Sequence, residues 1–204
     1  GLKGACFATA GVLTVKNFLE GSGGRAIART KAMEGPYGWK QRCKNAIDFK
    51  QIDRGDGNEV NVDYRSMTEC FNAEKKNIEA EIEARNAANE KVNEAISGIE
   101  ESGGIKTGDA VAGYSVDEPR AMGLYLQKLK SEFPDDETLN KLEPPTADGS
   151  APYSYADLRA IHSNLLLKRE LQTKGIGTNY VNSDYISLQE RLDDNIRVFE
   201  DYKK

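Results

Sequence analysis

The feature of the sequence that most constrains its fold is the stretch of residues 67–101, where apolar side chains recur at alternating three- and four-residue steps. This spacing places those side chains on one face of an α-helix. Ser66 and Glu69 form a capping box at its start, with a hydroxyl at the N-cap and a carboxylate three residues later. Arg85 and Asn89 interrupt the apolar face, and nine acidic residues against four basic ones lie along the stretch. The apolar positions are Phe71, Ile78, Ile82, Val92, Ile96 and Ile99. The sequence therefore predicts one long, acidic and largely solvated helix.

Other segments predict shorter helices, each with its own start or stop signal. The expected segments are residues 25–34, about 15 residues from Asp117, a short helix at Asp135-Asp136-Glu137, residues 154–173, and residues 184–202 with Asp184 as the N-cap. A Pro-rich connector over residues 142–152 separates the last two from the others.

The composition fits a helical protein with narrow apolar faces. Of the 204 residues, 38% are hydrophobic and 30% are charged, and only six Phe and one Trp are available as large core side chains. This balance suits long helices better than one thick core. From the length we expect one domain, or one domain with an appended arm, in preference to two very small domains. We predict a mainly α fold with a minor β part: an elongated helical bundle with one long acidic helix, a β-hairpin and an apolar N-terminal arm. The arm with its glycine hinge covers residues 1–24, and the helical body with the hairpin covers residues 25–204.

A β-hairpin is expected at about residues 46–64. Residues 46–49 (Ala-Ile-Asp-Phe) and 60–64 (Val-Asn-Val-Asp-Tyr) alternate apolar and polar side chains, which is the period of a half-buried strand. The residues between them include DRGDGN at 53–58, which is typical of a turn.

The triplet Arg54-Gly55-Asp56 within this turn resembles integrin-binding ligands, and an exposed hairpin tip is a suitable place for an adhesive motif. A plain turn between two strands is the simpler interpretation. A calcium loop fits poorly, because Gly55 and Gly57 stand where an EF-hand loop supplies oxygen ligands. We therefore expect a turn first, an adhesive tip second, and no metal.

The three cysteines, Cys6, Cys43 and Cys70, leave the redox state open. Cys43 and Cys70 lie on either side of the hairpin, and a disulfide between them would close a loop of 28 residues. Such a bond would stabilise the fold by about 3–4 kcal/mol. The alternative is three reduced thiols in a cytosolic protein. The sequence contains no CxxC motif, so neither a zinc ribbon nor a thioredoxin-like site is indicated.

The first 20 residues form an apolar segment that the glycines at 21–24 separate from the rest. The pattern does not decide between helix and strand. Between Lys3 and Lys16 only 12 uncharged residues occur, too few to span a membrane. Residues 8–10 (Ala-Thr-Ala) have the small-x-small form of a signal-peptidase site, but the apolar run before them is too short for a signal peptide, so we expect a mature protein. Exposed apolar segments of this kind need cover, and we expect a partner surface there. The residues predicted to bind that partner are Phe7, Val12, Leu13, Val15, Phe18 and Leu19.

Charge is distributed unevenly along the chain. Residues 1–44 contain eight Lys or Arg against two Glu, whereas the whole chain has a net charge of −5. This asymmetry favours contact between the basic region and an acidic surface, on another copy of the chain or on a different protein. The basic region contains no known nucleic-acid-binding motif, which argues against a nucleic-acid partner.

The sequence offers no convergent set of catalytic residue types, and its many carboxylates are too common to mark a site. His162 is the only histidine, so a zinc site with two or three imidazoles is excluded, and no nucleophile motif accompanies it. Residues 21–26 match the loose form G-x-G-x-x-A, but no buried strand precedes them, and we interpret them as a hinge. We expect no catalytic residues, no metal and no cofactor.

The sequence favours a non-enzymatic structural subunit that self-associates through its N-terminal arm, into a filament or a surface appendage. An apolar segment leading to a polar head is similar in outline to pilin-like subunits over the first 20 residues, although the charge-free helix with an early Glu is missing. One alternative is a secreted or surface adhesion module that uses Arg54-Gly55-Asp56, and another is a small enzyme with an unrecognised carboxylate site. An extracellular or cell-surface location is expected, or a cytoplasmic one if all three cysteines are reduced.

Overall fold

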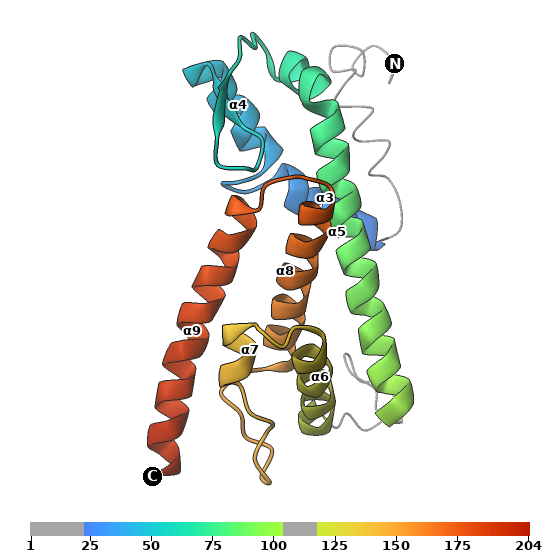
Figure 1. The fold of residues 1–204 in the computed structure, drawn as a ribbon, viewed down its shortest axis with the longest axis vertical. Helices are drawn as coiled ribbons and strands as arrows, with labels where there is room; N and C mark the ends of the chain where they lie inside the picture. Colours follow the sequence, from blue (N-terminus) through green and yellow to red (C-terminus); the bar gives the residue numbers. More distant parts are fainter. Residues whose placement is uncertain (1–22, 104–117) are drawn as a thin grey trace. The chain divides into compact units, whose positions relative to one another are not determined.

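The structure, a computed structural model, describes residues 23–103 and 118–204. Within these ranges the chain is mainly α with a minor β part, as predicted (Figure 1). The elements in chain order are α3 (Gly23–Met33), α4 (Trp39–Phe49), β1 (Gln51–Asp53), β2 (Glu59–Asn61), α5 (Met67–Gly103), α6 (Glu118–Glu132), α7 (Glu137–Lys141), α8 (Tyr155–Thr173) and α9 (Asn179–Lys203). The apolar arm over residues 1–20 lies outside the described residues.

The chain divides into two compact units. The first unit comprises the residues up to Glu90 together with Leu167–Val181, and the second comprises Lys91–Leu166 and Asn182–Lys204. All three boundaries fall inside helices, in α5, α8 and α9. No change of composition or loop signal marks such a boundary, so the body predicted over residues 25–204 contains a division that the sequence pattern does not indicate.

The first unit is built where α3, α4 and the hairpin pack on the first half of α5. Its core contains Ala32, Met33, Trp39, Cys43, Ala46, Ile52, Cys70, Phe71, Ile78 and Ile82. Phe71, Ile78 and Ile82 are the predicted apolar face of the long helix, and all three are buried. The apolar steps of α5 therefore pack as the sequence predicts in this half of the helix.

The first strand of the hairpin is not where the alternation at residues 46–49 placed it. These residues form the last turn of α4, because Trp39, Cys43 and Ala46 recur at helical steps and bury one face of that helix. Lys50 then adopts a left-handed conformation, with φ of 56°, and ends the helix. The observed strands pair antiparallel with Ile52 opposite Val60, so the hairpin is shorter than predicted and its first strand lies further along the chain.

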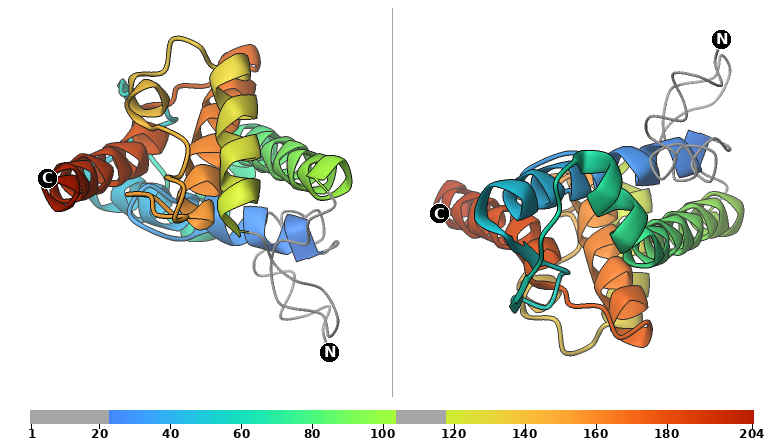
Figure 2. Two further views of the ribbon diagram at one scale, coloured as in Figure 1. Left: turned by 90° about the horizontal axis from the view of Figure 1, so that it is seen from below. Right: turned by 90° about the horizontal axis from the view of Figure 1, so that it is seen from above.

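The second unit has its own core, formed by α6, α7, the first half of α8 and parts of α5 and α9. Its buried residues are Ile99, Ala121, Met122, Tyr125, Leu126, Leu129, Leu139, Leu142, Tyr153, Tyr155, Leu158, Ile161 and Leu192. Helix α6 lies beside α8 (Figures 1 and 2). The predicted apolar faces of both helices thus pack against each other.

Side-chain caps fix the starts of three helices. The hydroxyl of Ser66 accepts a hydrogen bond from the Glu69 amide at 3.1 Å, which confirms the predicted N-cap of α5. Asp136 caps α7 by accepting from the Leu139 amide at 2.9 Å. Ser154 and Asp157 form a reciprocal capping box at α8, in which each side chain accepts from the other residue's amide. Helix α9 begins at Asn179 rather than at the predicted Asp184.

Candidate functional site

A groove in the second unit lies between the end of α9 and the segment that precedes α8. It consists of two adjoining hollows, of about 540 Å³ and about 480 Å³, which share part of their lining. The residues that line both hollows are Ala151, Tyr153, Ser154, Phe199 and Tyr202. One hollow extends toward Asp157 and Arg191, and the other toward Glu118 at the start of α6. We call the two hollows together the aromatic groove.

The last turns of α9 supply one wall of the aromatic groove. Asn195, Val198, Phe199 and Tyr202 recur at helical steps and therefore share one side of the helix. Val198 is 65% exposed and Tyr202 is 80% exposed. Exposed large apolar side chains that meet at a hollow are typical of an interaction site. This wall therefore offers aromatic and aliphatic surface to a ligand.

The opposite wall is rigid because Tyr153 is fixed at both ends. Its ring is buried in the core of the second unit, and its hydroxyl donates a hydrogen bond of 2.6 Å to the carbonyl oxygen of Glu143. Burial raises the pKa of Tyr153 to about 12, so the phenol stays protonated and keeps donating at neutral pH.

Asp157 and Arg191 pair at one end of the aromatic groove. The Asp157 carboxylate accepts a hydrogen bond from Arg191 and another from the Ser154 amide. Burial acts to raise the pKa of Asp157, but these hydrogen bonds and the charge of Arg191 outweigh it and lower the pKa below its usual range. The carboxylate is therefore ionised and neutralised by its partner, and this end of the groove carries a satisfied ion pair.

Sequence reasoning did not identify the aromatic groove. The sequence predicts Phe199 only as part of the packed face of its helix, and it assigns no role to Val198 or Tyr202. The Pro-rich connector over residues 142–152 contains part of one wall, but its composition indicates only a connector and not a hollow.

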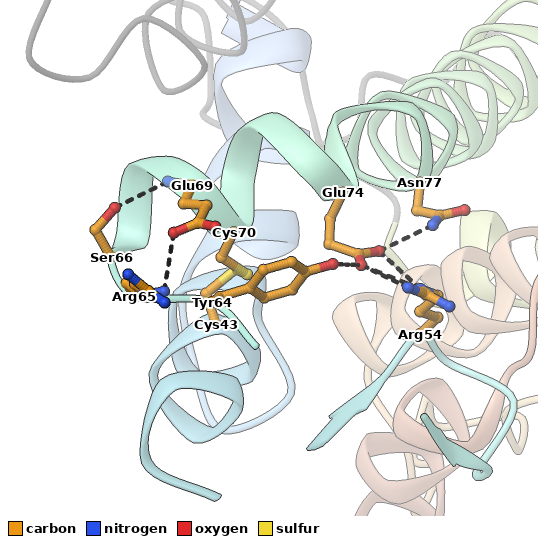
Figure 3. Close-up of a disulfide and its surroundings, with 9 residues drawn as sticks. All are labelled: Cys43, Arg54, Tyr64, Arg65, Ser66, Glu69, Cys70, Glu74 and Asn77. Carbon is orange, nitrogen blue, oxygen red and sulfur yellow. Dashed lines mark hydrogen bonds and ion pairs between the residues drawn. A yellow bond between two sulfur atoms is a disulfide. The ribbon is translucent and has the colours of Figure 1, made fainter. Parts of the chain in front are cut away.

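The hairpin tip places Arg54 against a buried carboxylate on α5 (Figure 3). The guanidinium donates three hydrogen bonds of 2.8–3.1 Å to Glu74, which is only 1% exposed. Tyr64 and Asn77 donate to the same carboxylate at 2.6 and 3.1 Å. Burial acts to raise the pKa of Glu74, but the hydrogen bonds from Arg54, Tyr64 and Asn77 lower it below its usual value. Arg54 therefore anchors the hairpin to the long helix.

The acidic side chains of the tip hold the turn itself. Asp53 accepts from the amides of Gly55 and Gly57 at 2.8 and 3.2 Å, and Asp56 accepts from the Asn58 amide at 2.9 Å. These are the local bonds by which Asp stabilises tight turns. The structure thus places Arg54 on Glu74, Gly55 in a buried position, and Asp56 exposed at the tip. The three residues do not present one continuous exposed surface.

Gly177, in the loop between α8 and α9, approaches the tip closely. A Cβ atom at this position would lie 1.7 Å from the carbonyl oxygen of Gly55 and 2.0 Å from the Cα atom of Asp56. Only glycine fits such a close approach of two backbones. The loop therefore covers part of the triplet, a contact between segments more than 100 residues apart in the sequence.

A second buried carboxylate, Glu81, lies further along α5. It accepts hydrogen bonds from the Trp39 indole at 2.8 Å, from Arg42, and from Arg85 at 3.3 Å. The Arg42 guanidinium also lies 3.7 Å from the centre of the Trp39 ring. The two guanidinium groups offset the charge of Glu81, and the indole donates a further hydrogen bond to it. The contacts from Trp39 and Arg42 join α4 to α5.

His162 lies in the core of the second unit, buried to 1% exposure. Its Nδ1 atom is 2.6 Å from the hydroxyl of Tyr125, and its Nε2 atom is 3.6 Å from the Glu132 carboxylate. Burial raises the pKa of Tyr125. The arrangement joins α6 to α8 through the polar atoms of three residues.

Cys43 and Cys70 form a disulfide within the core of the first unit, the pairing considered from their positions around the hairpin (Figure 3). The bond links α4 directly to the first turn of α5. Cys6 lies outside the described residues.

Several residues of the predicted partner-binding set also lie outside the described residues. They are Phe7, Val12, Leu13, Val15, Phe18 and Leu19. Across residues 23–103 and 118–204, no three His, Cys, Asp or Glu side chains gather closely enough to hold a metal ion. No helix within the described parts of the chain is long and apolar enough to cross a membrane.

Comparison of the chain with protein-family models, with curated proteins and with solved structures found no significant match.

Proposed function

We propose that this chain is a non-enzymatic assembly subunit that self-associates through the apolar segment of residues 1–20. The observation that carries the proposal is the exposed apolar surface at the end of α9, where Val198 and Tyr202 border the aromatic groove. The chain thus combines an apolar segment that needs cover with an apolar surface that can supply it.

The charges of the two regions support the same proposal. The second unit contains nineteen Asp or Glu against eleven Lys or Arg, which gives a net charge of −8. Residues 1–44 carry eight basic side chains against two acidic ones. Opposite net charges of this size favour an encounter between the basic region of one copy and the acidic unit of another.

The contact proposed here joins two different surfaces, so it is heterologous. Heterologous contacts produce a closed ring if the rotation between subunits closes, and an open filament if it does not. The assembly is therefore expected to grow with concentration beyond a symmetric dimer.

Sedimentation velocity of the full chain over a range of concentrations tests the proposal. The wild type is expected to show a mass above the 22.5 kDa of one chain, and the mass should rise with concentration. A variant with Phe7→Ser, Leu13→Ser and Phe18→Ser should stay at the mass of one chain. Phe49→Ser provides the matched control, because it removes an aromatic side chain that is 71% exposed in the first unit. A wild type that remains a monomer at every concentration would refute the proposal.

A further inference from the structure

We propose that the aromatic groove of the second unit is the acceptor site for residues 1–20 of a second copy of this chain. This inference rests on the proposed function and assigns the surface that receives the arm. The occupant is a short apolar segment that places aromatic and aliphatic side chains between Tyr153 and the exposed side of α9.

The size and lining of the aromatic groove suit an anchor of this kind. The larger hollow measures about 540 Å³, within the range of roughly 300–1,000 Å³ that binding pockets occupy. Tyr153 is fixed by its hydrogen bond to Glu143, so one wall needs no ordering when a ligand binds. Aromatic side chains that enter such pre-formed pockets contribute most of the binding energy of many protein interfaces.

Residues 1–20 have the side chains that the aromatic groove can receive. Phe7 and Phe18 are large aromatic anchors, and the residues between them are mostly small or aliphatic. A segment of small residues can lie close to the wall formed by α9 while its larger side chains enter the hollows. The apolar surface that water would otherwise contact on Val198 and Tyr202 is thereby covered.

The charges around the aromatic groove fit the ends of the segment. Lys3 and Lys16 flank the uncharged stretch. Asp157 is already neutralised by Arg191, so that end of the groove adds little net charge. Glu118 is exposed at the other end, on a unit whose net charge is −8. A basic apolar segment therefore fits this site better than an acidic one.

Photo-crosslinking of the full chain tests where the arm binds. A benzoylphenylalanine is placed at position 202, and the protein is mixed with an isotopically heavy wild-type copy before irradiation. The expected result is a crosslink from position 202 to residues 1–20 of the heavy chain. The control places the same photo-reactive residue at position 49, where no crosslink to residues 1–20 is expected. Crosslinks only within one chain, or only to other segments, would overturn the inference.

Substitutions in the aromatic groove give an independent measurement. Tyr202→Ala combined with Val198→Ser should weaken self-association at least tenfold, because it removes two exposed apolar side chains of the acceptor wall. Both side chains are largely exposed, so circular dichroism should be unchanged. If the arm variant abolishes association and the groove variant leaves it unaltered, the inference fails and the proposed function stands. If the wild type does not associate at all, both fail.

Discussion

Glu74 is buried in the first unit together with the side chains that satisfy its charge. Arg54, Tyr64 and Asn77 all donate to its two oxygens, and Arg54 comes from the hairpin tip, twenty residues earlier in the chain. Removing a single partner of a buried carboxylate leaves part of its desolvation cost uncompensated. The position of the hairpin on α5 therefore depends on the side chain of Arg54.

The substitution Arg54→Ala should lower the free energy of unfolding at pH 7 by about 1–2 kcal/mol. The value lies at the low end of the range for charged hydrogen bonds because the Arg54 side chain is 37% exposed and Glu74 keeps two other donors. Chemical denaturation of the full chain measures it. Arg65→Ala is the matched control, since the exposed Arg65 contributes only its backbone amide to the bond with Glu69. If the two substitutions lower the free energy of unfolding equally, Arg54 does not anchor the hairpin to α5.

The loss of unfolding free energy caused by Arg54→Ala should depend on pH, whereas the loss caused by Arg65→Ala should not. Glu74 has a lowered pKa in the folded state, so its ionised form stabilises the fold above the unfolded pKa of about 4.5. This stabilisation is lost as the pH falls through the lower, folded pKa, where the carboxyl becomes protonated. The cost of Arg54→Ala should therefore shrink as the pH is lowered below about 4.5, while Arg65→Ala shows no such trend.

The surroundings of Arg54 show which features of a residue its sequence context predicts and which it does not. The turn itself was predictable, because Asp53, Gly55 and Gly57 are turn formers at close spacing, and the structure confirms it. The partner of Arg54 was not predictable. One Glu among nine acidic residues on the long helix faces the hairpin, and only the packing of the hairpin on α5 selects it.

At the scale of elements, helices with clear local signals were predictable. The capping box at Ser66 and the apolar steps after it located α5, and Asp136 located α7. Helix α4 was missed because the four residues 46–49 also fit a strand period, and Cys43 was considered only as a disulfide partner. The aromatic groove was not predictable, since its walls are distant in the sequence and meet only through tertiary packing.

Asp157 connects two elements, and its substitution should be costly. It accepts from the Ser154 amide as part of the cap of α8, and it pairs with Arg191 on α9. Asp157→Ala should lower the free energy of unfolding by about 1–2 kcal/mol. Asp193→Ala is the matched control, because its ion pair with Lys141 is exposed on both sides and should contribute less than about 1 kcal/mol. Thermal and chemical denaturation measure the stability of both variants. If Asp193→Ala lowers the free energy of unfolding as much as Asp157→Ala, the contacts of Asp157 contribute no more than an exposed ion pair.

At the scale of the whole molecule, the described residues 23–103 and 118–204 form two separate cores. The disulfide, the buried carboxylates Glu74 and Glu81, and the hairpin all belong to the first unit, whereas His162 and the aromatic groove belong to the second. The long helix α5 contributes residues to both cores. Local stability in such a chain can differ between units, because each core opens according to its own contacts.

The disulfide offers a test of this division. By the loop-entropy estimate, a bond that closes the loop between Cys43 and Cys70 stabilises the folded state by about 3–4 kcal/mol. In the double variant Cys43→Ser, Cys70→Ser, hydrogen exchange should quicken at amides of α4 and the first turns of α5. The amides of α6, whose contacts lie in the other core, should exchange as in the wild type. Cys6→Ser is the control and should change neither set. Equal acceleration in both units would show that they unfold as one cooperative body.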